Sequence, residues 1–93
     1  IITTGGTGLG PRDNTTDTLK SLFDKEIPGI SETMRAFGQE RTPFAMLSRS
    51  IAGTIGKTLI VSVPGSTNGA KESVSAILPA IFHAKKMMRG EGH

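Results

Sequence analysis

The sequence predicts an α/β domain, and two strand-to-helix transitions carry this prediction. The apolar pair Ile1-Ile2 precedes a glycine-rich loop, after which a helical pattern begins. The apolar run Thr58–Val63 precedes a second turn rich in glycine and hydroxyl residues, and a long helical pattern follows it. Near-continuous apolar strands of this kind are typical of sheets that are buried on both faces.

Two helical segments are expected after the glycine-rich loop that follows the first strand. Residues 16–24 carry leucines and a phenylalanine on one face, with Asn14 or Thr15 as the N-cap. Pro28-Gly29 then breaks the chain, and a second apolar periodicity runs as far as Gly38.

A short helix is expected from Pro43 to Arg49, with Phe44, Met46 and Leu47 as its apolar anchors. The turn 53–56 then leads into the second strand, and these two strands are the only ones that the pattern indicates.

The last helix is expected from about Asn68 to Arg89, because its apolar residues keep helical spacing. Pro79 lies inside this segment, so it should kink the helix or restart it as a second one.

Length and composition narrow the class of protein. A chain of 93 residues is one small domain at most, and the absence of cysteine excludes disulfides and thiolate chemistry. No apolar run reaches the roughly 20 residues of a membrane span, so we expect a cytoplasmic protein without membrane contact. The net charge of +3 suggests nucleic acid, but the four aromatic residues are all phenylalanine and form no stacking pattern. We therefore expect no nucleic-acid partner.

The glycine loop between Thr3 and Thr15 is the first candidate site. Its glycines let the backbone approach a ligand, and its N–H groups and hydroxyls precede a helix N-terminus, where anions bind well. Arg12 adds a guanidinium suited to phosphate. The alternative is an ordinary tight connection, and the spacing matches neither GxxxxGK[ST] nor GxGxxG.

Two further polar segments are candidates. Ser48, Arg49 and Ser50 could bind a phosphate or the carbonyl edge of a pterin, or they could simply end a helix. The turn 64–68 follows the second strand, where ligands of open α/β sheets bind, although its hydroxyls could equally cap the helix. Asp13 could help to hold Mg²⁺, or it could pair with Arg12 or stabilise the N-terminus of the following helix.

Four segments in order resemble the molybdopterin-binding Mog/MoaB family, which includes the G domain of gephyrin. They are TTGGTGLGPRDNTTDTL at 3–19, IPGISETMR at 27–35, TPFAMLSRSIAG at 42–53 and KTLIVSVPGSTNGAKESVSAILPAIFHA at 57–84. The resemblance covers nearly the whole chain with the expected order and spacing.

The resemblance implies a three-layer α/β/α fold with a mostly parallel sheet, and molybdopterin, ATP and Mg²⁺ as ligands. Active members transfer AMP from Mg-ATP to molybdopterin in molybdenum cofactor synthesis. The implied catalytic residues are Asp13 and Ser48, with Asp13 also a candidate for Mg²⁺. The implied binding residues are Thr4, Gly5, Gly6, Thr7, Gly8, Pro11, Arg12, Ser48, Arg49, Ser50, Pro64, Gly65 and Ser66.

The resemblance also implies that residues 1–93 are the C-terminal part of one domain. In the family, further strands and most metal-binding acidic residues precede the glycine loop, and the domain assembles as a homotrimer. We therefore expect the N-terminal strands to come from another segment or chain. A non-catalytic molybdopterin carrier or scaffold remains the alternative function. A related CinA-like nucleotide-processing enzyme is disfavoured because GTGLGPRD departs from its usual loop.

Overall fold

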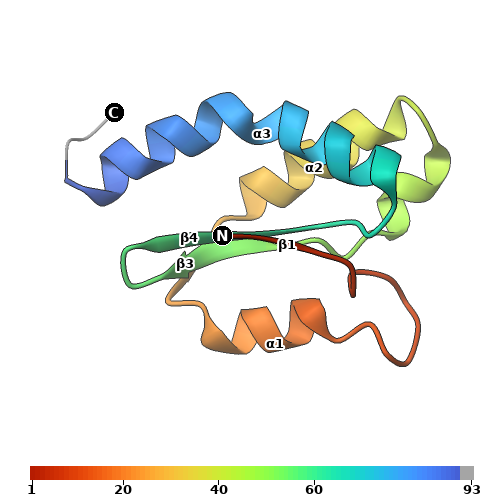
Figure 1. Ribbon diagram of the computed structural model, residues 1–93, viewed down its shortest axis with the longest axis horizontal. Coiled ribbons are helices and arrows are strands. Elements are labelled where there is room, and N and C mark those ends of the chain that lie inside the picture. Colours follow the sequence, from red (N-terminus) through yellow and green to blue (C-terminus); the bar gives the residue numbers. More distant parts are fainter. Residues whose placement is uncertain (91–93) are drawn as a thin grey trace.

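A four-stranded sheet forms the middle of the computed structural model, which describes residues 1–90 (Figure 1). The strand order is β1-β4-β3-β2. The strands are β1 (Ile2–Thr4), β2 (Lys25–Glu26), β3 (Ala52–Ile55) and β4 (Thr58–Val63).

Helices cover both faces of this sheet. Helix α1 (Thr15–Leu22) lies on one face, whereas α2 (Pro28–Gln39) and the long α3 (Thr67–Met88) lie on the other (Figure 1). A short 3₁₀ helix, η1 (Pro43–Leu47), connects α2 to β3. The predicted α/β class and its three layers are thereby confirmed.

The sheet is mixed within residues 1–90, rather than mostly parallel. Strands β1 and β4 pair in parallel, with Ile2 opposite Val61. Strands β3 and β4 form an antiparallel hairpin, and β2 adds to β3 antiparallel. The parallel pair is the important one for the site, because both of its strands end at the same edge of the sheet.

Strands β2 and β3 correct the expectation of only two strands. Gly53 is not part of a turn but pairs with Ile60 inside β3, and the hairpin turn lies at Gly56 and Lys57. Strand β2 is only two residues long, and both of them are charged and exposed. Such strands depend on a paired neighbour rather than on their own apolar pattern.

The helix starts agree closely with their sequence signals. Asn14 is the N-cap of α1, and Pro28 is the first residue of α2, where its missing N–H costs nothing. Ser66 caps α3 by accepting the Gly69 N–H at 3.2 Å. Helix α3 continues through Pro79 to Met88 as one helix. Of the two expected effects of Pro79, a kink or a restart, the restart is therefore wrong.

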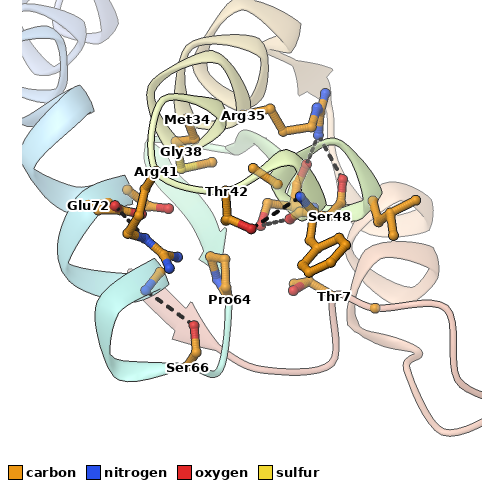
Figure 2. Close-up of a pocket in the computed structure, with 17 residues that line it drawn as sticks. Thr7, Met34, Arg35, Gly38, Arg41, Thr42, Ser48, Pro64, Ser66 and Glu72 are labelled. Carbon is orange, nitrogen blue, oxygen red and sulfur yellow. Dashed lines mark hydrogen bonds and ion pairs between the residues drawn. The ribbon is translucent and has the colours of Figure 1, made fainter.

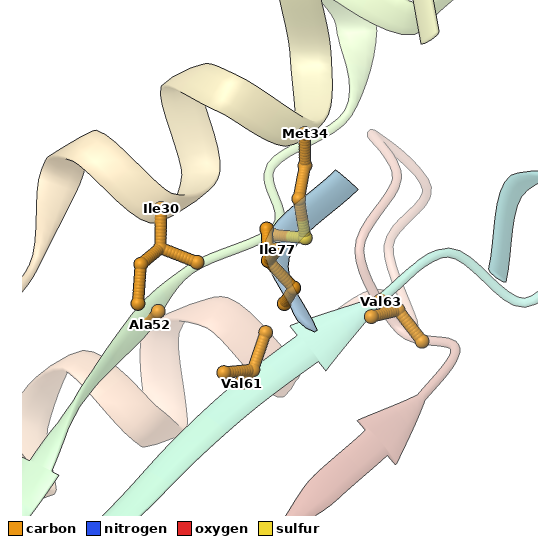
Figure 3. Packing of buried hydrophobic residues seen from close by; sticks show 6 residues of the cluster. All are labelled: Ile30, Met34, Ala52, Val61, Val63 and Ile77. Carbon is orange, nitrogen blue, oxygen red and sulfur yellow. The ribbon is translucent and has the colours of Figure 1, made fainter. Parts of the chain in front are cut away.

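The main core lies between the sheet and the pair α2–α3 (Figure 3). Its side chains come from four elements and meet on one face of the sheet. They are Ile30, Met34, Ala52, Val61, Val63 and Ile77. Burial of this apolar surface fixes α2 and α3 over β3 and β4, and thereby fixes the helix ends that border the site.

The apolar residues of η1 are not anchors, contrary to expectation. Phe44, Met46 and Leu47 are 74%, 64% and 52% exposed. Helix η1 is held instead by its cap, in which the Thr42 hydroxyl accepts the Phe44 N–H. Within residues 1–90, no helix combines the length and apolarity that crossing a bilayer requires.

Candidate ligand-binding site

A cavity of about 380 Å³ lies at the edge of the sheet where β1 and β4 end (Figure 2). The loops after these strands, the end of α2, helix η1 and the first turns of α3 form its walls. This volume lies within the range of small-molecule sites. The position is also the crevice at the carboxyl ends of parallel strands, where open α/β sheets bind ligands.

The structure brings together residues from all three polar segments that the sequence singles out. Each of these segments contributes to the same cavity wall, although the segments are far apart in the chain. The predicted residues that line the cavity are Thr7, Gly8, Ser48, Ser50, Pro64 and Ser66.

Ser48 and Ser50 form a hydroxyl pair on this wall. Their Oγ atoms lie 3.0 Å apart, and the Ser50 N–H donates to the Ser48 Oγ at 3.2 Å. Ser50 is buried, whereas Ser48 is only half-buried. A ligand in the cavity therefore meets a hydroxyl pair whose geometry is already fixed by its own hydrogen bonds.

Arg35 is a lining residue that the sequence reasoning missed. It reaches from α2 to the serine segment, where its Nη1 donates to the Ser48 carbonyl at 3.3 Å and to the Ser50 carbonyl at 3.1 Å (Figure 2). Arg35 thus fixes the backbone that carries both hydroxyls.

An ion pair on another wall was also missed. The Arg41 Nε lies 2.6 Å from the Glu72 Oε1, and this contact connects the chain just after α2 to the first turns of α3. Both residues line the cavity. The two residues are thirty-one positions apart, so their spacing in the sequence does not predict the pair.

Other predicted site residues lie outside the cavity wall. Arg12 is exposed in the glycine loop, and a Cβ on Gly65 would lie 3.3 Å from the Cα of Gly5. The predicted residues that do not line the cavity are Thr4, Gly5, Gly6, Pro11, Arg12, Asp13, Arg49 and Gly65.

Asp13 organises the glycine loop. Its Oδ2 accepts the Gly10 N–H at 2.8 Å. A Cβ on Gly8 would lie 2.8 Å from the same oxygen, so the turn needs glycine there to make room for the carboxylate. Among residues 1–90, no group of three or more His, Cys, Asp or Glu side chains gathers as metal ligands would.

Arg49 and Asp17 form an ion pair behind the glycine loop. The Arg49 Nη2 lies 3.0 Å from the Asp17 Oδ2. The hydrogen bond from Arg49 and its positive charge hold the pKa of the Asp17 carboxyl below its ordinary value. The same contact raises the pKa of the Arg49 guanidinium, so both groups are charged at neutral pH.

Comparison with known proteins identifies relatives with this sequence and fold. A 93-residue match at 50% identity is the molybdenum cofactor biosynthesis bifunctional protein of Chlorobaculum tepidum, covering all of this chain and 30% of that protein. The molybdopterin adenylyltransferase of Helicobacter pylori is 38% identical over 90 residues, which is 97% of this chain and 51% of that protein. The molybdopterin biosynthesis enzyme MoaB of Thermus thermophilus superposes with a TM-score of 0.88 at 50% identity, covering 97% of this chain and 57% of that structure.

The chain spans between about a third and a little over half of these relatives. The family model described as "probable molybdopterin binding domain" matches residues 1–83, which include every residue of the cavity wall. The chain therefore belongs to the family of probable molybdopterin binding domains.

Proposed function

We propose that this domain binds molybdopterin in the cavity and acts in molybdenum cofactor biosynthesis. One observation carries the proposal most directly. Hydroxyl groups from three distant segments line a cavity at the carboxyl ends of β1 and β4 and at the N-terminus of α3. This arrangement suits a ligand with a polar ring edge and a phosphate.

The polar groups among the lining residues support a ligand that carries hydrogen-bond acceptors. The Ser66 oxygen already accepts from the Gly69 N–H, so its hydroxyl hydrogen is available to donate. The positive end of the α3 dipole lies at the same corner and favours a negatively charged group. A phosphorylated pterin offers both acceptor atoms and negative charge.

We further propose a specific activity for the domain, which is the transfer of AMP from ATP to molybdopterin. The terminal phosphate of molybdopterin would attack the α-phosphorus of ATP, a P–O bond would form, and pyrophosphate would leave. Such chemistry needs correct positioning and charge neutralisation rather than a protein nucleophile. In this proposal Ser48 and Ser50 orient the pterin side, and Thr7 and Gly8 border the phosphates. The relative named molybdopterin adenylyltransferase supports this activity.

The residues described here do not by themselves fit a Mg²⁺ site. Asp13 is the one acidic residue of the glycine loop, and one of its oxygens is already engaged by the Gly10 amide. Mg²⁺ usually takes one or two carboxylates together with substrate phosphates. The acidic ligands of Mg-ATP are therefore expected from outside this chain, and we assign no catalytic step to a metal held by residues 1–90.

The experiment uses the domain completed with the upstream segment of a longer relative, which would supply the missing acidic ligands. It measures molybdopterin binding by calorimetry and pyrophosphate release in the presence of Mg-ATP. Ser48→Ala should weaken binding by about 1 kcal/mol, the usual net value of one hydrogen bond. Ser75→Ala, at an exposed position of α3, is the matched control and should change nothing. Absence of molybdopterin binding by the wild-type protein would refute the proposed function.

The alternative function is a non-catalytic molybdopterin carrier or scaffold of the same fold. The two alternatives differ in one measurement, because a carrier binds molybdopterin but releases no pyrophosphate. Binding that is weakened by Ser48→Ala without any turnover would therefore support the carrier.

A further inference from the structure

Arg49 lies between Ser48 and Ser50 in the sequence, but it does not line the cavity. Its Nε donates to the Gly8 carbonyl at 3.1 Å, and its Nη2 donates to the Asp13 carbonyl at 3.0 Å. The same guanidinium meets the Asp17 carboxylate at 3.0 Å. One side chain therefore contacts the glycine loop at Gly8 and Asp13 and also contacts the first turn of α1.

The backbone of Arg49 adds two contacts to the same region. Its N–H donates to the Thr7 carbonyl at 2.7 Å. Its carbonyl accepts from the Thr16 hydroxyl at the start of α1. The serine segment, the glycine loop and α1 are thus joined at this one residue, although the serine segment lies more than thirty positions from the other two in the chain.

These contacts leave the guanidinium little capacity for a ligand. Nε, Nη1 and Nη2 all donate to groups of the protein, and Arg49 does not line the cavity. The carbonyls of Gly8 and Asp13 are turned toward Arg49, and this fixes how the loop backbone faces the cavity.

We propose that Arg49 is a positioning residue, which holds the glycine loop and the hydroxyl pair Ser48–Ser50 in one geometry without touching the ligand. The proposal rests on the proposed function, because the geometry that it protects is that of the molybdopterin cavity. It differs from the expectation that the Arg49 charge binds phosphate directly.

The two roles predict opposite effects of removing Asp17. A guanidinium that binds phosphate would be released by Asp17→Asn, so the affinity for a phosphorylated ligand would stay the same or rise. A positioning guanidinium would lose the charge of this partner and one of its two hydrogen bonds, because the Asn amide keeps a single acceptor oxygen, so the affinity would fall. Asp17 is suitable for this test because its side chain is 66% exposed and lies outside the core.

The variant Arg49→Lys gives a second test that distinguishes a phosphate-binding role of Arg49 from a positioning role. Lysine also binds phosphate as a point charge, so Arg49→Lys should keep much of the affinity if the residue is a ligand. Lysine lacks the planar fork that reaches the Gly8 carbonyl, the Asp13 carbonyl and Asp17 together. If the residue positions the loop, Arg49→Lys should fail to rescue binding.

The experiment uses the wild-type chain, Arg49→Lys, Arg49→Gln and Asp17→Asn, with Lys86→Gln and Glu32→Gln as exposed controls. Molybdopterin affinity is measured by calorimetry, and hydrogen exchange of the backbone amides of residues 7–10, 12 and 13 is measured without ligand. Both Arg49 variants should bind about tenfold more weakly, in keeping with the loss of charge-assisted hydrogen bonds. Asp17→Asn should shift the affinity in the same direction by a smaller factor.

In the ligand-free protein, exchange should accelerate at residues 7–10, 12 and 13 in the Arg49 variants and stay unchanged in β4. Unchanged exchange of the loop, or an Asp17→Asn variant that binds as tightly as wild type, would overturn the positioning role. If the wild-type chain does not bind molybdopterin, the proposed function fails, while the exchange data still decide whether Arg49 holds the loop.

Discussion

A Cβ atom on Gly65 would lie 3.3 Å from the Cα of Gly5, so the loops after the two parallel strands touch backbone to backbone. The Gly5 N–H also donates to the Val63 carbonyl at 3.0 Å, which extends the pairing of β1 and β4 by one residue. The walls of the cavity that follow these strands are therefore held at a fixed separation.

Gly5→Ala should lower the free energy of unfolding by about 1 kcal/mol, because Gly5 has a φ of +87°, a conformation that disfavours a Cβ. Gly29→Ala is the matched control, since Gly29 lies in the first turn of α2 with nothing within 4 Å of its Cβ position. It should raise the free energy of unfolding by about 0.5 kcal/mol. Urea denaturation of both variants checks the prediction, and two shifts of the same sign would contradict it.

Thr3→Val should stabilise the domain by about 1 kcal/mol, because it removes a buried polar atom that lacks a partner. The Thr3 Oγ1 is buried without a hydrogen bond in the part of the chain that the structure describes. Valine has nearly the same shape and suits a strand. Thr58→Val, at an exposed position of β4, serves as the control. A thermal midpoint that falls in Thr3→Val would show that this hydroxyl is satisfied.

The ion pair of Asp17 and Arg49 predicts a pH dependence of stability. Since the pKa of Asp17 is lowered in the folded state, the contribution of the pair is fully present above about pH 4, the usual unfolded value. It is lost as the pH falls through the folded value. Lys20 adds to the lowering, and Asp13 also faces Arg49.

Urea midpoints of the wild type and Asp17→Asn, measured at about pH 7 and about pH 2, test this dependence. The difference between the two proteins should shrink at the lower pH. Glu32→Gln should show no such convergence. A difference that is constant with pH would mean that the Asp17 charge does not stabilise the fold.

The free edge of β1 predicts an additional strand. Within residues 1–90, β1 pairs only with β4, while Ile1 and Ile2 are 71% and 48% exposed. A second cavity, of about 410 Å³, lies beside them and is lined in part by Ile81 and Met88 of α3. Exposed apolar strand edges favour association. We expect a strand from another segment or chain to pair with β1, and the homotrimer that the family resemblance implies stays a prediction.

Sedimentation of the 93-residue chain tests this expectation, and self-association should increase with protein concentration. Addition of the upstream part of a longer relative should suppress it. A monodisperse, cooperatively folding monomer of the chain alone would refute the added strand.

Patterns within one segment could be predicted from the sequence. The apolar run of β4, the Ser66 cap and the periodicity of α3 each depend on neighbouring residues, and the structure agrees with them. Strand β2 could not be predicted, because Lys25 and Glu26 become a strand only through pairing with β3.

In the candidate site, too, features within one segment could be predicted and contacts between distant segments could not. The two serines and the two loops could be predicted from the sequence, because their polar residues directly follow a predicted strand or lie at the end of a predicted helix. Arg35 was missed because it donates to carbonyls thirteen and fifteen residues away. Every residue has a backbone carbonyl, so the types of the accepting residues do not indicate such a contact. The Arg49–Asp17 contact spans thirty-two positions and depends on how the loop folds.

The hairpin of β3 and β4 is joined by a two-residue turn, whereas the pairing of β1 with β4 joins residues almost sixty positions apart. Loop closure disfavours the long connection, so the hairpin is the part of the sheet expected to form first during folding. The cavity needs the strand that joins later, because Thr7 reaches Ser48 and Ser66 only once β1 has docked. We therefore expect binding competence to follow the docking of β1, and a ligand that occupies the cavity should stabilise the chain after that step.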